Sequence, residues 1–152
     1  DPLLTYNVLK VLNHDVSAFT QGLEYIKSSN TFLESTGLWR QSTLREVDIT
    51  TGNVLRKVDL APQFFGEGCT MLKGKIYQIT WREKTCLVYD ATTFQPADPP
   101  QLGYDTDGWG LTNDGEFVIM TDGTANVYFR DPLTFQKVRQ VRAHEVVGGT
   151  VR

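Results

Sequence analysis

Polar and apolar positions alternate along the chain in short runs that recur at a regular distance. Three runs, "STLREVDITTGNVL", "TCLVYDATTFQPA" and "NVYFRDPLTFQKV", each contain an aspartate that is followed by a turn containing threonine. The three aspartates, Asp48, Asp90 and Asp131, stand 42 and 41 residues apart. Because alternation over a few residues is typical of half-buried β-strands, the runs predict strands in a structural repeat of about 42 residues.

A second set of motifs supports the same repeat. The segments "TQGLEYI", "GEGCTML" and "GWGLTND" align on Gly22, Gly68 and Gly110, which stand 46 and 42 residues apart. These glycines and the aspartates above are independent landmarks. Their similar spacing indicates one repeated unit that occurs three times.

The connections between the apolar runs are typical of β-hairpins. They include Lys73-Gly74-Lys75, Asn113-Asp114-Gly115 and Thr51-Gly52-Asn53. No stretch has the helical period of 3.6 over ten residues, so the chain is predicted to be all-β. A repeat of about 42 residues with four strands is typical of a propeller blade rather than of a sandwich.

We therefore predict a single β-propeller domain over residues 1–152, with about three blades at residues 19–64, 65–107 and 108–147. Closed propellers need about four to eight blades, so the predicted ring is incomplete. A companion segment or another copy of the chain is expected to supply the rest. The leading segment "LTYNVLKVLNH", residues 4–14, is predicted to be a strand that belongs to the last blade.

Composition and charge exclude several classes of function. The net charge of −3 and the pI of about 5.3, without a run of like charges, give no reason to expect a nucleic acid or an anionic membrane as partner. No window approaches the roughly 18 apolar residues of a membrane span. Cys69 and Cys86 lack the spacing of a zinc site, so we expect buried free thiols and no metal.

The repeat also predicts where a functional site would lie. In a propeller the start of the first strand of a blade and the end of its second strand share one face, so Glu67 and Trp81 are expected to meet. Gln21, Glu67 and Trp109 each precede the repeat glycine and would ring the same mouth. A repeat without a functional site would be expected to carry similar residues at the three positions. Their dissimilarity favours a specialised site.

Each of these residues also has a purely structural interpretation. Gly66-Glu67-Gly68 is expected to form a turn, which either aims the carboxylate into the mouth or lets it bind backbone amides or Arg82. Trp81 and Trp109 either line the site or pack between blades. The sequence alone leaves these alternatives open.

Two further side chains are less well placed. Glu34, in "LESTG", is either a second carboxylate at the mouth or a solvated one. For Trp39 the sequence offers no strong reason to expect a function.

Several motifs, in this order and spacing, resemble a known family. They are "FTQGLEY", "ESTGLW.QSTL", "FGEG", "YQITW", "DGWGLTNDG" and "MTDGT". Together they resemble the plant and bacterial type of glutaminyl-peptide cyclotransferase, or glutaminyl cyclase, from about Phe19 to Val141. The resemblance implies a five-bladed propeller of which some two blades are absent here.

The resemblance also implies a reaction, in which the N-terminal glutamine of a peptide or protein becomes pyroglutamate and ammonia leaves. It implies that Glu67 is the catalytic acid and base, and that Gln21 binds the amide. Trp81 and Trp109 would line the pocket and exclude water from it. Glu34 is the remaining candidate for substrate binding. The family type implies neither a cofactor nor a catalytic metal.

Two functions from other classes remain open on the sequence. A non-catalytic propeller would bind peptides or act as a scaffold, since fold alone does not determine function. A glycoside hydrolase would pair Glu67 with Glu34. The family resemblance further implies a secreted, periplasmic or endomembrane location, with which Asp1 as the first residue is compatible.

Overall fold

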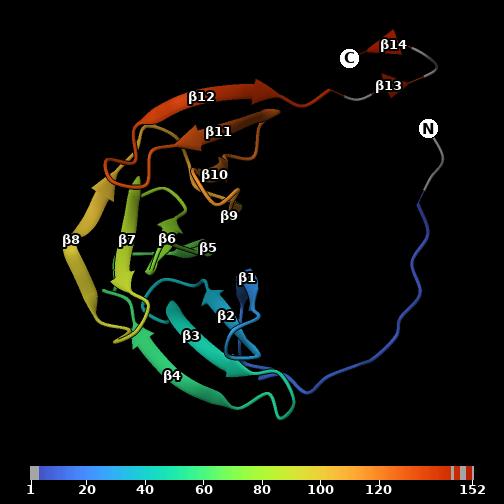
Figure 1. Cartoon of the computed structure of the whole chain (residues 1–152), viewed down its shortest axis with the longest axis vertical. Helices are drawn as coiled ribbons and strands as arrows, with labels where there is room; N and C mark the ends of the chain where they lie inside the picture. The colour runs from blue at the N-terminus through green and yellow to red at the C-terminus, as the bar shows by residue number, and fades with distance from the viewer. Residues whose placement is uncertain (1–3, 145, 148–149, 152) are drawn as a thin grey trace.

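The computed structural model describes residues 4–144, 146–147 and 150–151, and its regular structure consists of antiparallel strands. Three four-stranded sheets follow one another in chain order (Figure 1). The first contains β1 (Thr20–Ile26), β2 (Thr31–Thr36), β3 (Thr43–Asp48) and β4 (Val54–Asp59). The second contains β5 (Gly66–Leu72), β6 (Lys75–Thr80), β7 (Thr85–Asp90) and β8 (Pro96–Gly103). The third contains β9 (Leu111–Asn113), β10 (Val118–Thr121), β11 (Asn126–Arg130) and β12 (Lys137–Arg142), after which β13 (Val146–Val147) pairs with β14 (Thr150–Val151).

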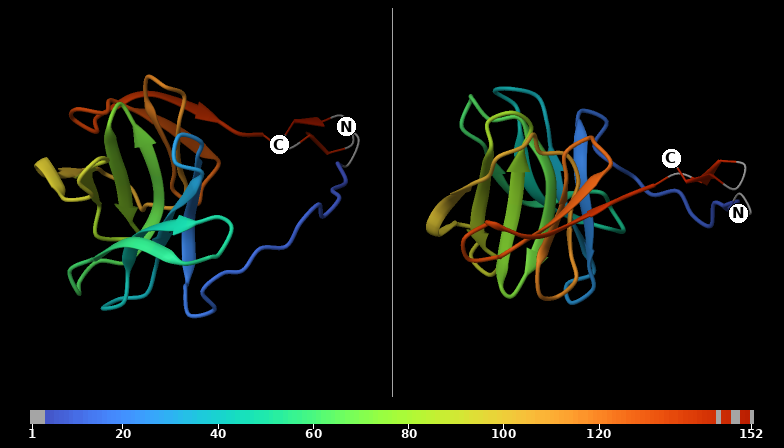
Figure 2. Two further views of the ribbon diagram at one scale, coloured as in Figure 1. Left: turned by 60° about the horizontal axis from the view of Figure 1, so that its bottom comes forward. Right: turned by 90° about the horizontal axis from the view of Figure 1, so that it is seen from above.

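The three sheets lie around an arc, with the second sheet between the first and the third (Figures 1 and 2). The first strand of each sheet, β1, β5 or β9, lies innermost, and β4, β8 and β12 lie outermost (Figure 1). This is the arrangement of consecutive propeller blades. The prediction of an all-β propeller with about three four-stranded units is confirmed.

Glycine allows the innermost strands of neighbouring blades to approach closely. A Cβ on Gly22 would stand 2.7 Å from the backbone nitrogen of Cys69, and a Cβ on Gly68 would overlap the backbone nitrogen of Leu111. The amide of Gly68 also donates to the carbonyl of Trp109 across the same boundary (2.8 Å). Gly22 and Gly68 are therefore required by contact between blades, because only glycine permits such close backbone approach. Gly110 differs, since a Cβ there would stand 2.9 Å from the Thr121 hydroxyl oxygen of its own blade.

The recurring aspartates stabilise the turn between the third and fourth strands of each blade. Asp90 Oδ1 accepts hydrogen bonds from the amides of Thr92 (3.0 Å) and Thr93 (2.7 Å) and from the Thr93 hydroxyl. Asp48 and Asp131 make the same pattern of bonds in the other two blades. Aspartate followed by threonine thus recurs because one carboxylate satisfies several turn donors.

Apolar side chains fill the two spaces between neighbouring blades. Between the first and second blades pack Leu33, Leu44, Phe64, Cys69, Ile76, Leu87, Tyr89 and Phe94. Between the second and third pack Leu72, Tyr77, Ile79, Cys86, Val88, Tyr104, Val118, Met120, Tyr128 and Phe135. Each core therefore depends on two blades.

Both cysteines belong to these cores and are free thiols, as the sequence predicts. Burial raises the pKa of the thiols of Cys69 and Cys86, which keeps both protonated and unreactive.

One predicted strand is absent. Residues 4–14 form no strand, and residues 4–11 are exposed and run away from the sheets (Figures 1 and 2). The prediction that this segment adds a strand to a last blade is wrong for this structure. A strand needs hydrogen bonds to a neighbouring strand, and no residue of this segment pairs with a strand of the three sheets.

Over the residues that the structure describes, no helix is present that could cross a membrane. In the same part of the chain, no three His, Cys, Asp or Glu side chains gather closely enough to hold a metal ion.

Candidate active site

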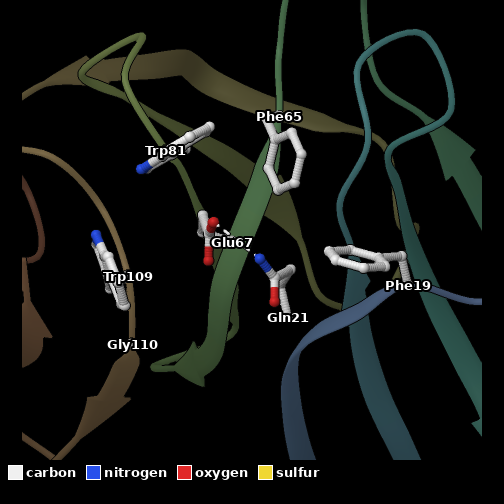
Figure 3. A pocket seen from close by; sticks show the side chains of 7 residues that line it. All are labelled: Phe19, Gln21, Phe65, Glu67, Trp81, Trp109 and Gly110. Carbon is white, nitrogen blue, oxygen red and sulfur yellow. Dashed lines mark hydrogen bonds between the residues drawn. The ribbon is translucent and has the colours of Figure 1, made fainter. Parts of the chain in front are cut away.

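A cavity of about 380 Å³ opens where the three blades meet at one end of their inner strands. Its size falls in the range of small-molecule sites. Figure 3 shows Glu67 at its centre, with Gln21 on one side and the two indoles of Trp81 and Trp109 on the other. The cavity is lined by Phe19, Gln21, Phe65, Glu67, Trp81, Trp109 and Gly110. Four of the five predicted site residues therefore lie together.

Glu67 lies in an irregular part of β5, where the register with β6 shifts between Gly66 and Cys69. The prediction of a turn at residues 66–68 is wrong, because these residues belong to the strand. An irregularity of this kind re-aims a side chain without ending the sheet. Glycines on both sides permit it, since a Cβ on Gly66 would stand 2.7 Å from the carbonyl oxygen of Thr36.

Glu67 is 8% exposed, and its carboxyl lies in a largely aromatic environment. In the described residues its hydrogen bond comes from Gln21, whose Nε2 donates to Oε1 at 3.0 Å (Figure 3). Burial raises the pKa of Glu67 to about 7, the Gln21 bond opposes this rise, and the charge of Glu83 adds to it. A carboxyl that titrates near neutrality can both accept and return a proton.

The two tryptophans are fixed by backbone contacts from different blades. Trp81 follows β6, and its amide donates to the carbonyl of Phe65 (3.0 Å). Trp109 precedes β9, and its amide donates to the carbonyl of Thr121 (3.0 Å). Gly123 leaves room for the Trp109 indole, since a Cβ there would stand 2.7 Å from the ring. The motif "MTDGT" therefore supports one wall of the cavity.

Glu34 lies elsewhere. It is 1% exposed on β2 and lines a separate cavity with Leu23 and Phe32. Its Oε1 accepts from the Thr20 hydroxyl (2.6 Å) and lies 2.7 Å from His14 Nε2. Glu34 is thus neither solvated nor in the cavity of Glu67, because the first blade and the segment before it enclose its carboxylate.

Arg82 does not pair with Glu67 in the described residues. Its guanidinium carbon instead lies over the ring of Trp81, 3.8 Å from the ring centroid. The structure therefore favours the interpretation in which Glu67 faces the mouth over the one in which it forms an ion pair.

Phe19 and Phe65 line the cavity although the sequence analysis assigned them no role. Each stands two residues before a predicted site residue, Gln21 or Glu67. Because side chains alternate along an extended chain, a spacing of two was a signal that could have found them.

Comparison with known proteins shows the family to which the chain belongs. The sequence profile described as glutamine cyclotransferase matches residues 1–148. The chain belongs to the glutamine cyclotransferase family. Membership confirms the resemblance that the motifs "FGEG" and "DGWGLTNDG" indicated.

Two relatives of the family illustrate the similarity. The glutaminyl-peptide cyclotransferase of Arabidopsis thaliana is 41% identical over 125 residues, which is 81% of this chain and 38% of that protein. The crystal structure of Myxococcus xanthus glutaminyl cyclase is 25% identical with a TM-score of 0.75, and the match covers 95% of this chain and 65% of that one. The chain thus spans less than two thirds of either relative.

A more distant structure shares the fold alone. The WD40 domain of Neurospora crassa Pan2 is 9% identical with a TM-score of 0.58, over 83% of this chain and 50% of that one. WD40 repeats form four-stranded propeller blades, which agrees with the three sheets seen here.

Proposed function

We propose that this chain provides the catalytic part of a glutaminyl-peptide cyclotransferase, which converts the N-terminal glutamine of peptides and proteins to pyroglutamate and releases ammonia. The observation that carries the proposal is the position of Glu67, a carboxyl with a pKa of about 7 in a cavity walled by aromatic side chains. Family membership and the two relatives support it.

The reaction is intramolecular in the substrate. The α-amine attacks the γ-amide carbon, the new N–C bond closes a five-membered ring, and the bond to the amide nitrogen breaks. Because both reacting groups belong to one residue, the protein needs mainly to fold the side chain back and to move protons. The Glu67 carboxylate would accept a proton from the attacking nitrogen and return it to the departing ammonia.

The other cavity residues would hold the substrate in that geometry. The Gln21 side chain carries a carbonyl oxygen and an amide, so it can bind the substrate amide while its Nε2 donates to Glu67. Trp81 and Trp109 would exclude water, which would otherwise hydrolyse the amide to glutamate.

An assay with a glutamine-led dipeptide tests the proposal directly. Release of ammonia together with loss of the free amine is the expected result. Binding of the dipeptide without turnover would instead support a non-catalytic propeller, an alternative favoured by the presence of only three blades in the described part of the chain. A glycosidase that pairs Glu67 with Glu34 finds no support, since the two carboxylates line different cavities.

We also propose that a companion segment completes the propeller, because the first and third sheets lie at the two ends of an open arc (Figure 1). Co-purification of a second polypeptide that restores or raises turnover would support this. The secreted, periplasmic or endomembrane location stays a prediction, which fractionation of the source cells would test.

A further inference from the structure

Trp39 lies directly beside the cavity of Glu67, although it does not line that cavity. Its ring centroid is 5.1 Å from that of Phe65 and 5.6 Å from that of Trp81, and these two rings are themselves 5.6 Å apart. Both neighbours line the cavity. The three rings thus form one aromatic surface that continues from the cavity wall to the outside.

Trp39 remains 46% exposed despite these two contacts. A tryptophan that served only to pack the protein interior would be largely buried. Arg82 already covers the ring of Trp81 at 3.8 Å, so Trp39 is the part of this surface that offers accessible aromatic area at the rim.

The loop that carries Trp39 holds its backbone in an unfavourable conformation. Leu38 and Arg40, on either side of it, have φ values of +80° and +68°. Residues other than glycine rarely adopt such angles, and those that do cluster at ligand-binding and catalytic sites.

Several contacts fix this loop to the cavity wall. The indole Nε1 of Trp39 donates to Glu83 Oε1 at 3.1 Å, and Glu83 Oε2 accepts from the amide of Phe65 at 3.4 Å. The Ser42 hydroxyl donates to the carbonyl of Leu38 (2.8 Å) and accepts from the amide of Gly66 (3.0 Å). The indole is therefore preorganised before any ligand arrives.

We propose that Trp39 binds the side chain of the second residue of the substrate peptide and that this site favours an aromatic residue there. The proposal rests on the proposed function, in which the first residue occupies the cavity beside Glu67. The rest of the peptide must then leave through the rim, where the accessible face of Trp39 offers an aromatic side chain an offset or edge-to-face contact.

The test compares two substrates, Gln-Phe-amide and Gln-Gly-amide, which differ only in the second side chain. In Trp39→Ala we expect kcat/KM for Gln-Phe-amide to fall roughly 5- to 10-fold, from the loss of one aromatic contact and its buried area. For Gln-Gly-amide the change is expected to stay below about two-fold, since glycine offers nothing to stack. Trp39→Phe, which keeps a ring but loses the bond to Glu83, should recover most of the preference.

Leu133→Ala is the matched control, since Leu133 is an exposed apolar residue (71%) in the turn between β11 and β12. It should leave both substrates unchanged. An equal fall for both substrates in Trp39→Ala, or no fall for either, would overturn the proposal.

A binding measurement separates this inference from the proposed function. If the wild-type chain turns over neither substrate, the proposed activity fails for this chain, and calorimetry with the products pyroglutamyl-Phe-amide and pyroglutamyl-Gly-amide still tests Trp39. Weaker binding of the Phe product alone in Trp39→Ala, by roughly 5- to 10-fold, supports the proposal. An unchanged Kd, or no detectable binding of the Phe product to the wild type, contradicts it.

Discussion

At the scale of single residues, Glu67 combines two properties that favour catalysis and oppose stability. The residue is nearly buried, and the side chain that donates a hydrogen bond to its carboxyl is an uncharged amide, Gln21. An arginine in that position would keep the carboxyl ionised and unsuited to return a proton. The amide instead orients the carboxyl and leaves its pKa near 7.

Glu67→Gln should keep the fold and lower turnover by roughly 10²-fold or more, because the amide cannot exchange the proton that the reaction needs. The measurement is steady-state release of ammonia from a glutamine-led dipeptide. Turnover close to that of the wild type would reduce Glu67 to a structural residue of β5.

The dependence of activity on pH should reflect two groups. Glu67 must be ionised to accept a proton and has a pKa of about 7, while the substrate α-amine must be neutral and titrates at about 8. A plot of log kcat/KM against pH should therefore approach a slope of two below pH 7 and a slope of one between the two values. A slope of one throughout would mean that Glu67 does not titrate in this range.

The unfolding free energy should fall over the pH range in which activity rises. The carboxyl titrates at about 7 in the folded chain and at about 4.5 when unfolded, so between these values the folded state holds a proton that the unfolded state releases. Stability conferred by the protonated group is therefore lost as pH rises from 4.5 through 7. Glu67→Gln should be more stable than the wild type at pH 8, by about 1–3 kcal/mol, and close to it at pH 4.5. Chemical denaturation at the two pH values would measure this, and a less stable variant at pH 8 would contradict it.

At the scale of elements, the contact between innermost strands determines how closely the blades approach. Gly68→Ala would place a Cβ against the backbone of Leu111, which cannot move without shifting β9. We expect a loss of about 1–3 kcal/mol in unfolding free energy, the usual cost of overpacking.

Gly103→Ala, at the end of β8, is the control, because a Cβ there meets nothing within 4 Å. Thermal or denaturant unfolding of both variants gives the comparison. Equal stability of the two would show that blade spacing tolerates the additional methyl group.

Elements and site residues differ in how far the sequence predicts them. The aspartate turns depend on residues two and three positions apart, so their pattern is visible in the sequence at Asp48, Asp90 and Asp131. Gln21, Glu67 and Trp109 were predictable because the repeat makes their positions equivalent.

Other features depend on contacts that no local pattern signals. Trp39 contacts Phe65 and Trp81 of the cavity wall from a loop with two unusual φ values. The Glu34 carboxylate lies against His14, which comes from a segment with no strand. In the sequence, the irregular part of β5 at residues 66–68 resembles a turn, because glycine is common both in turns and in irregular parts of strands.

At the scale of the whole molecule, the arc leaves the outer faces of the first and third sheets without a neighbouring blade (Figure 1). Leu23 and Tyr25 on β1 are 56% and 49% exposed, and Val138 and Val141 on β12 are 57% and 41% exposed. Such surfaces favour association. Purified alone, the chain should form species larger than its 17.2 kDa monomer at micromolar concentration, measured by light scattering after gel filtration.

Leu23→Lys should weaken that association by placing a charge on the open face, whereas Leu133→Lys, in a turn, should not. A stable monomer at these concentrations would mean that the open faces are tolerated in water.

The glycine contacts also bear on the rotational symmetry of the blades. Gly22 and Gly68 give the two boundaries between blades the same inner-strand packing, while the residue before each repeat glycine differs. The framework is therefore approximately symmetric about the propeller axis, and the chemistry is the part that breaks the symmetry. Duplication of a blade followed by divergence at the position before the glycine would place a carboxylate in one blade and an amide or indole in the next. The glycine contacts between the inner strands would be unchanged.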